Sequence, residues 1–187
     1  MEWNGRPALR LCAKLLRHKD QIAEMILKGR IWKPVIAGLC GTTVHFLFMY
    51  FKSRSGLLPS FQPYRSFQLA LSQWLGANIP AIVPWALSFV NGMTILGFLF
   101  GRINRFLPGR NGAIKGLTFG LLGWVLMDLI FFPLIGLGPF AMAVGLGIKP
   151  AVLSLAMVLT YSIVLGSVYV TLDKWNAVNR YEPKSLK

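Results

Sequence analysis

Acidic residues are scarce in this sequence. Asp and Glu together account for only 6 of the 187 residues, against 20 Lys and Arg, and the formal net charge at pH 7 is +14. Enzymes that work through paired carboxylates need two acidic side chains in one site. Here only one acidic residue, Asp128, lies within an apolar segment. The sequence offers no carboxylate pair for catalysis within a membrane, and we expect that the protein is not an enzyme.

Cysteine and histidine are also rare, with two of each. Cys12 lies in a basic segment and Cys40 in an apolar one, without the paired spacing that ligates zinc or frames disulfides. His18 and His45 fall in different segments, so a haem held by two histidines of one chain is not expected. Nucleophile-elbow, phosphate-loop and His-Glu-x-x-His motifs are missing too. We predict no catalytic residue, no metal site and no cofactor.

Long hydrophobic runs dominate the chain instead. Hydrophobic residues make up 55% of the sequence and charged residues only 14%, a balance too apolar for a soluble domain of this size. About 20 apolar helical residues cross a hydrocarbon core roughly 30 Å thick. The segments that reach or approach this length are 34–51, 79–100, 113–137 and 150–172. The predicted fold class is all-α, a polytopic membrane protein with four transmembrane helices within residues 34–172.

The basic residues favour one topology. Sixteen of the 20 Lys and Arg lie before the first span, between the second and third, or after the fourth, and the remaining four are Lys52, Arg54, Arg65 and Lys149. Positive charge accumulates on the cytoplasmic side of membranes. Both termini are therefore predicted to be cytoplasmic, with residues 173–187 as a cytoplasmic tail. This distribution also explains the net charge without a nucleic-acid partner.

Residues 1–33, before the first span, are predicted to form a basic amphipathic helix over 7–29. Basic side chains can occupy most faces of this helix, while one face is left to apolar side chains: Ala8, Leu11, Leu15, Ile22 and Ile26. We expect it to lie on the anionic lipid of the inner leaflet, although it could dock on a protein partner instead. No cleavable signal peptide is evident, because charges occur throughout the segment.

Asp128 interrupts the third span at a depth of about 10 Å from the outer boundary, at roughly 1.5 Å per residue. An ionised carboxylate facing lipid costs at least a few kcal/mol, so it should face the bundle interior. A count from the span ends places five more polar side chains near this depth: His45, Ser88, Asn91, Thr160 and Tyr161. We expect His45, Asn91 or Tyr161 to contact Asp128. This polar layer could hold the helices together, or an Asp–His couple could relay protons or coordinate a cation.

Glycines recur every four residues at the start of the third span, as Gly112, Gly116 and Gly120. This spacing leaves one helix face without side chains, so another backbone can approach closely. Gly97 and Gly101 repeat the spacing at the same depth of the second span. The sequence therefore predicts that the second and third spans pack through these five glycines.

The third span is predicted to break near its outer end. Pro133 removes a backbone donor, and Gly136 and Gly138 loosen the turns that follow. A shallow outer cavity above Asp128 would bury or hydrate the freed backbone groups, or the same residues could simply form a tight return into the fourth span. In the first outer connection, the mixture of aromatic, apolar and polar residues over 63–76 indicates a short interfacial helix.

A motif extends over the second half of the chain. It has a Lys-Gly start, an apolar helix with Trp, a Pro-Leu-x-Gly-x-Gly-x-Phe exit and a final Leu-Gly-x-x-Tyr, formed by Lys115, Gly116, Trp124, Pro133, Leu134, Gly136, Gly138, Phe140, Leu165, Gly166 and Tyr169. In this motif the chain resembles a large uncharacterised family of small four-helix bacterial inner-membrane proteins, and more distantly an inner-membrane protein associated with acid resistance. Ser88 and Val158 stand where that family commonly has histidines. The resemblance therefore implies a fold and a bacterial inner membrane, without a haem or metal role.

Together these features favour a non-catalytic accessory subunit that packs against a larger membrane complex. The competing interpretation is a small transporter, channel or proton-handling protein built around Asp128. Four helices are few for a monomeric transporter, so that function would require a homo-oligomer. The expected partners are membrane lipid and either a larger membrane complex or a second copy of the chain.

Overall fold

The computed structural model describes residues 31–181, with side chains described as far as Trp175. Four helical segments are long and apolar enough to cross a membrane: Trp32–Arg54, Ile82–Ile103, Gly112–Leu134 and Lys149–Trp175. No strand occurs in the described range. The predicted fold class, an all-α membrane protein with four transmembrane helices, is confirmed. The amphipathic helix predicted over residues 7–29 lies outside the described residues.

Two of the four spans are interrupted by a π-helical turn, in which each backbone N–H bonds the carbonyl five residues earlier instead of four. The elements, in chain order, are α2 (Trp32–Arg54), α3 (Pro63–Leu75), α4 (Ile82–Asn91), the π-helical turn η1 (Gly92–Leu96), α5 (Gly97–Ile103), α6 (Gly112–Leu126), the π-helical turn η2 (Met127–Phe131), α7 (Phe132–Leu134), the 3₁₀ helix η3 (Pro139–Val144) and α8 (Lys149–Tyr181).

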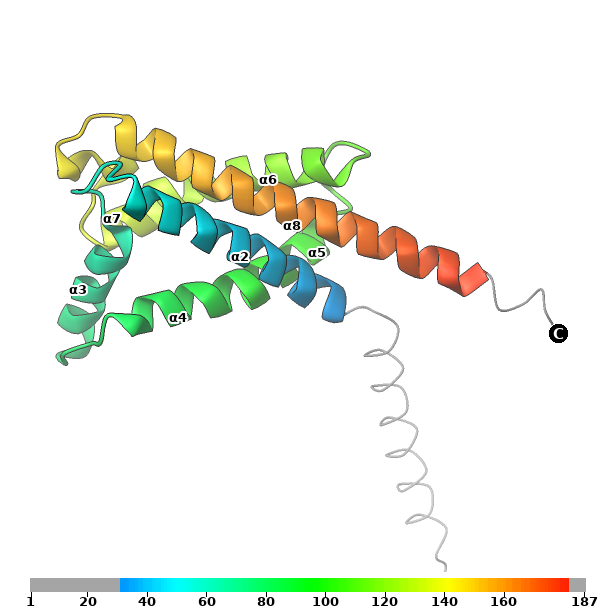
Figure 1. Cartoon of the computed structure of the whole chain (residues 1–187), viewed down its shortest axis with the longest axis horizontal. Coiled ribbons are helices and arrows are strands. Elements are labelled where there is room, and N and C mark those ends of the chain that lie inside the picture. Colours follow the sequence, from blue (N-terminus) through cyan, green and yellow to red (C-terminus); the bar gives the residue numbers. More distant parts are fainter. Residues whose placement is uncertain (1–30, 182–187) are drawn as a thin grey trace, which may run out of the picture.

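The long helix α8 is central to the bundle. It makes its most extensive contacts with α6 and its next most extensive with α2 (Figure 1). The second span contacts α2 mainly through η1 and α5, and α4 diverges from α8 towards α3. We call the end of the bundle that carries α3 the α3 end. It also contains the broken end of the third span and the start of α8.

The fourth span continues beyond the predicted end at residue 172. No glycine or proline occurs between Gly166 and Pro183, so nothing in the sequence terminates the helix before Tyr181. Asp173 in this extension forms an ion pair with the buried Lys33 of α2, with 2.7 Å between Nζ and Oδ1. This pair fastens α8 to the start of the first span.

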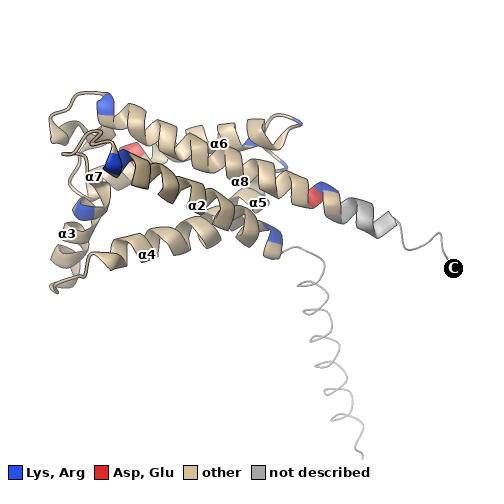
Figure 2. Ribbon diagram, in the orientation of Figure 1, with Lys and Arg blue, Asp and Glu red and all other residues tan. Residues whose placement is uncertain are grey.

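Charged residues lie towards the two ends of the bundle, and the middle of the four spans is almost free of them (Figure 2). The exception is Asp128, which lies within the third span in the π-helical turn η2. This distribution is expected of helices that cross hydrocarbon, where an unpaired charge is costly. It indicates that the apolar middle of the bundle is the part that faces lipid.

The glycines of α6 do allow a close helix contact, but with a different partner from the one predicted. A Cβ atom at Gly112 would overlap the backbone of Gly166, and one at Gly116 would overlap the carbonyl of Ser162. A Cβ at Gly120 would lie 2.9 Å from the Cβ of Ser162. The face therefore packs on α8, whose own small residues Ser162 and Gly166 match it. The predicted pairing of the second span with the third was wrong.

The glycines of the second span face α2 instead. A Cβ at Gly97 would overlap the carbonyl of Pro34, and a Cβ at Gly101 would lie 3.3 Å from the Cγ of Pro34 and 3.2 Å from the ring of Tyr169. In the same way, a Cβ added at Gly38 of α2 would overlap the backbone carbonyls of Gly92 and Met93. Small residues therefore join α2 to α5 and η1. A bare glycine face gives no information on which of several small faces it will meet.

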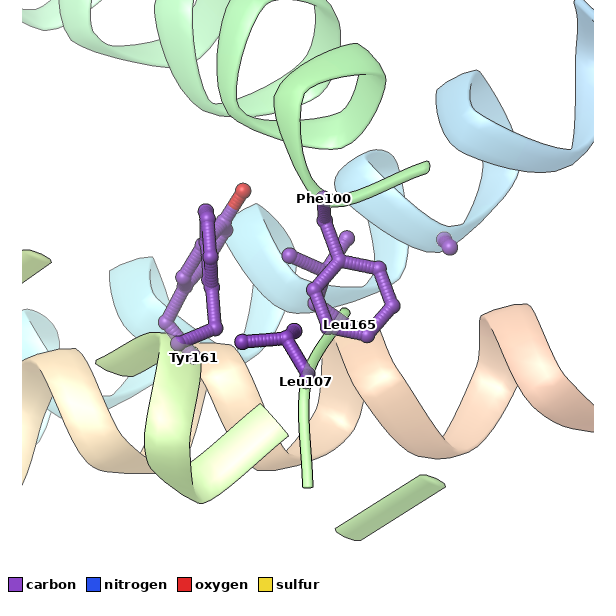
Figure 3. Close-up of a cluster of buried hydrophobic side chains, with 6 residues drawn as sticks. Phe100, Leu107, Tyr161 and Leu165 are labelled. Carbon is purple, nitrogen blue, oxygen red and sulfur yellow. The ribbon is translucent and has the colours of Figure 1, made fainter. Parts of the chain in front are cut away.

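Two hydrophobic clusters fill the interior. The first, towards the end opposite α3, brings together side chains from α2, α5, α6, α8 and the loop between the second and third spans (Figure 3): Ala37, Phe100, Leu107, Phe119, Tyr161 and Leu165. The second lies at the α3 end: Phe61, Ala70, Phe132, Ile135, Leu137 and Ala141. The second cluster joins α3 to the broken end of the third span.

The short helix expected over residues 63–76 is present as α3. Pro63 occupies its first turn, where the missing N–H has no helical partner to lose. Gly76 ends it with φ of 62°, a left-handed conformation that glycine adopts readily. On this helix Ala70 is buried against the second cluster, whereas Trp74 and Leu75 are exposed.

Candidate functional site

Asp128 lies where the third span changes from α-helix to π-helix. In a regular α-helix, Pro133 would lack its N–H bond and press on the carbonyl of Leu129. In η2 the bonding skips one residue further, and the Phe132 N–H donates to the Met127 carbonyl. The helix thus accommodates Pro133 without ending. Because π-helical turns are frequent at functional sites, Asp128 is the first residue to consider as one.

The side chain of Asp128 has no exposed surface. Both of its carboxyl oxygens lie 3.3 Å from Oγ of Ser154 in α8. The indole Nε1 of Trp124 donates to the same Oγ over 3.0 Å, and Ser154 Oγ lies 2.9 Å from the carbonyl of Ala151. We call Trp124, Asp128 and Ser154 the α6–α8 polar cluster, because it joins these two helices one to two turns from the α3 end.

A count of the available protons indicates how the hydrogen-bonding groups of Asp128 are paired. The hydroxyl of Ser154 has one proton, and its nearer acceptor is the Ala151 carbonyl. When the proton goes there, Asp128 bonds Ser154 only as a neutral carboxylic acid that donates its own proton. The ion pair found among the described side chains joins Lys33 to Asp173. Asp128 has no cationic partner among them. The cluster suits a neutral structural acid, and also a group that releases and regains a proton.

Phe140 covers the α6–α8 polar cluster from the α3 end. Its ring centroid is 5.6 Å from that of Trp124. Phe140 and Ala141 have φ of 52° and 55°, a left-handed conformation that costs about 1–2 kcal/mol for residues other than glycine. The packing of Phe140 on Trp124 and the complete burial of Ala141 offset this strain. The return into α8 therefore packs against the cluster at Trp124.

The predicted partners of Asp128 were wrong. It bonds Ser154 rather than His45, Asn91 or Tyr161, because α6 packs against α8 and not against α2 or α4. Tyr161 is on α8, but seven residues beyond Ser154, which is about 10 Å along a helix. Ser154 is only four residues, about 6 Å, from the predicted start of the fourth span, closer to the outer boundary than the roughly 10 Å assigned to Asp128. The residue count therefore did not select it, and such a count gives depth without direction.

His45 and Ser88 belong to a separate network at the α3 end. His45 Nε2 and Ser88 Oγ each lie 3.2 Å from the hydroxyl of Tyr64 in α3. The Tyr64 ring stacks on Trp85 of α4 with centroids 4.0 Å apart. Burial raises the pKa of Tyr64, against a smaller opposing effect of its bond to Ser88, so this hydroxyl keeps its proton at neutral pH. The network ties α2, α3 and α4 together.

Tyr161 and Thr160 both satisfy backbone carbonyls. The Tyr161 hydroxyl donates to the carbonyl of Gly92 over 2.7 Å and so bonds α8 to the π-helical turn η1. Thr160 Oγ1 donates over 2.7 Å to the carbonyl of Ala156, one turn back in α8. Tyr161 therefore links two spans, whereas Thr160 bonds only within its own helix.

Asn91 is directed away from the bundle. Its side chain is exposed, and within the described side chains it makes no hydrogen bond. Its expected place in an interior polar layer was wrong, because the face of the second span that meets α2 is formed by Gly92, Gly97 and their neighbours. The six polar residues thus divide into the α6–α8 polar cluster, the Tyr64 network, the Tyr161 bond and two residues without a link between spans.

Lys52, at the end of α2, is a buried cation. From the sequence it counted only as one of the basic residues that predict the orientation in the membrane. It is 8% exposed. Its Nζ donates to the Phe61 carbonyl over 2.5 Å and lies 5.5 Å from the centre of the Phe61 ring. Phe61 in turn packs edge-on against Phe132. Lys52 therefore holds the loop before α3 against the end of α2, and Phe61 in that loop contacts the broken end of the third span.

A groove of about 690 Å³ lies between α3 and the broken end of the third span. It is bordered by one side of α3 and by the residues that follow η2: Ser66, Leu69, Ala70, Ser72, Gln73, Pro133, Leu134, Ile135 and Gly136. An outer cavity was expected above Asp128. The groove does occur at the break, but Asp128 is not among its lining residues.

Within the described residues, no group of three His, Cys, Asp or Glu side chains could hold a metal ion.

Comparison with known proteins places the chain by family alone. No curated protein and no solved structure matches the chain. A family of unknown function, DUF6789, matches residues 29–179, which contain all four spans. The predicted membership of an uncharacterised family is confirmed at this level. The chain belongs to the DUF6789 family of unknown function.

Proposed function

We propose that this protein is a non-catalytic accessory subunit of a larger membrane complex and binds its partner through the second span. The observation that carries the proposal is the outward direction of Asn91. This residue is exposed and lies about 14 Å from the start of the span at roughly 1.5 Å per residue, close to the middle of a hydrocarbon core about 30 Å thick.

A carboxamide facing lipid at that depth has no water to bond. Its two donors and its acceptor are satisfied when another helix supplies a polar group, and such interhelical bonds contribute up to about 1–2 kcal/mol. Asp128, His45 and Tyr161 already have polar partners within the chain. Asn91 is thus the polar side chain best placed to bond a second protein.

The second span has room for such a partner. Over the apolar part of each span, only 17% of the second is buried within the chain, against 33% of the first, 22% of the third and 39% of the fourth. Leu87, Ile95 and Phe98 are 46%, 63% and 41% exposed and lie about one turn apart on either side of Asn91. We call these four residues the Asn91 face. Because α4 diverges from α8 (Figure 1), the Asn91 face is open to helices of a partner protein.

Replacing Asn91 with leucine should reduce recovery of a co-purified membrane protein by about tenfold, the effect of losing an interhelical bond of about 1.4 kcal/mol. The measurement is quantitative mass spectrometry after mild detergent extraction of the full chain. A photo-crosslinking residue at Ile95 should attach to the same protein. The matched control is the crosslinker at Leu122 of α6, which is 55% exposed on another helix.

Two results would contradict the subunit proposal. One is a crosslink from position 95 to a second copy of this 20.8 kDa chain, which would favour a homo-oligomer. The other is equal recovery of the partner with wild type and Asn91→Leu, together with equal crosslinking from positions 95 and 122. That outcome would mean that the Asn91 face contacts only lipid.

A second candidate function, proton handling or transport by a homo-oligomer, is supported by one observation. Asp128 is fully buried in a π-helical turn with a single hydroxyl group as its side-chain partner. An acid held in this way can bind or release a proton without breaking an ion pair. The tests of Asp128 that separate this function from a structural role are given in the Discussion.

The proposed location is a bacterial inner membrane, with both termini in the cytoplasm and the N-terminal segment on anionic lipid. In a variant without Cys12 and Cys40, a cysteine at Ser60 should react with an impermeant thiol reagent in intact cells, and one at Ser185 should be protected. The 16 basic residues on the proposed cytoplasmic side predict this result. The reverse labelling pattern would show that the topology is inverted.

A further inference from the structure

The groove between α3 and the third span is lined by both apolar and polar residues. Its apolar wall contains Leu69 and Leu134, which are 60% and 59% exposed. Ser66 and Gln73 of α3 also line the groove, and neither side chain makes a hydrogen bond among the described side chains. An amphipathic ligand would match such a surface better than a wholly polar or wholly apolar one.

The charge at this end of the bundle is of one sign. Arg54, Arg65 and Lys149 are exposed, and Lys52 is buried beneath the loop before α3. Figure 2 shows basic positions around the α3 end, and the acidic residue described in this part of the chain is Asp128 of η2. Since Asp128 has no exposed surface, the accessible charge there is positive. An anionic group is therefore the complementary ligand.

The depth of the groove restricts that ligand further. Leu134 is the last residue of the third span, and the groove continues through Ile135 and Gly136, where the helix has ended. It therefore lies where the hydrocarbon core meets the headgroup region. Arg65 directly precedes Ser66, and Leu69 follows one turn later, so cation, hydroxyl and apolar wall succeed one another along α3.

We propose that this groove binds one phospholipid with an anionic headgroup. Its phosphate lies against Ser66 and the neighbouring Arg65, and one acyl chain runs along Leu69 and Leu134 into the membrane. Arginine and hydroxyl groups are suitable donors to phosphate oxygens. The proposal is independent of the subunit function, because the groove involves α3 and the third span rather than the Asn91 face.

The test compares two leucines of the third span that are equally exposed. Leu134 lines the groove and Leu126 does not, and both are 59% exposed. The full chain is stripped of lipid in detergent and mixed with dioleoyl phosphatidylglycerol or dioleoyl phosphatidylcholine, and retained lipid is counted by native mass spectrometry. Wild type should retain one phosphatidylglycerol per chain. Leu134→Trp, which fills the groove, should reduce retention at least fivefold, and Leu126→Trp should not.

Charge provides a second, milder variant. Arg65→Gln should remove the preference for phosphatidylglycerol over phosphatidylcholine and leave helicity unchanged, because Arg65 is exposed on α3. Glycerol 3-phosphate, which has the phosphate without acyl chains, should not compete at millimolar concentration. The proposal is overturned if wild type retains no lipid, if Leu134→Trp and Leu126→Trp retain it equally, or if glycerol 3-phosphate displaces it.

Discussion

Gly116→Leu should lower the melting temperature and the folded yield sharply, because it forces α6 away from α8. A Cβ atom at this position overlaps the carbonyl oxygen of Ser162 and lies 3.0 Å from the Cα of Ile163. These are backbone atoms of a packed helix and cannot rotate aside. Overpacking typically costs about 1–3 kcal/mol, and a leucine against backbone at the most extensive helix contact of the bundle should reach the upper end. Circular dichroism during heating in detergent measures the effect.

Gly123 of the same helix is the matched control. A Cβ at Gly123 meets nothing within 4 Å, so Gly123→Leu should leave the melting temperature nearly unchanged. The pair separates the interface from a general effect of replacing a helical glycine. Equal losses for Gly116→Leu and Gly123→Leu, or no loss for either, would contradict the close contact between α6 and α8.

Asp128→Leu should destabilise the protein by about 1–3 kcal/mol, whereas Asp128→Asn should be tolerated. Leucine is larger than aspartate, the position is completely enclosed, and extra volume in a packed site is costly. Leucine also loses the bond to Ser154. Asparagine keeps the size and, like a neutral acid, presents one donor and one acceptor to Ser154. Thermal unfolding of each variant in the same detergent gives the comparison.

A double-mutant cycle isolates the bond itself. Asp128→Ala and Ser154→Ala, alone and together, should show a coupling of about 0.6 kcal/mol or more, the average for hydrogen bonds between membrane helices, up to a maximum of about 1.7 kcal/mol. A coupling near zero would remove the structural role assigned to the α6–α8 polar cluster. Met127→Ala, at a neighbouring position outside the cluster, should be additive with Ser154→Ala.

The same asparagine variant distinguishes the two candidate functions. If Asp128 only supports helix packing, Asp128→Asn keeps both the fold and the association through the Asn91 face. If Asp128 handles protons, the variant folds normally but loses proton-coupled activity in reconstituted vesicles, because an amide does not release a proton at physiological pH. A folded Asp128→Asn protein with full proton-coupled activity would eliminate the proton-handling function.

The polar residues show why the site was harder to predict than the spans. The high cost of exposing a carboxylate to lipid requires burial of Asp128, and its side chain is fully enclosed. Counting residues along a span gives the height of a side chain but not the direction in which it projects. His45 and Ser88 therefore meet through Tyr64, Asp128 meets Ser154, and Asn91 faces outwards at a similar height.

The sequence by itself determined the number of spans, their approximate bounds and the short helix α3. Each of these depends on local properties, since about 20 apolar residues suffice for a span whatever its neighbours are, and Pro63 and Gly76 delimit α3. Only the tertiary structure decided which helices touch. Gly112 and Gly116 could have met any small face of similar spacing, and the choice of Ser162 and Gly166 depends on how all four spans pack at once.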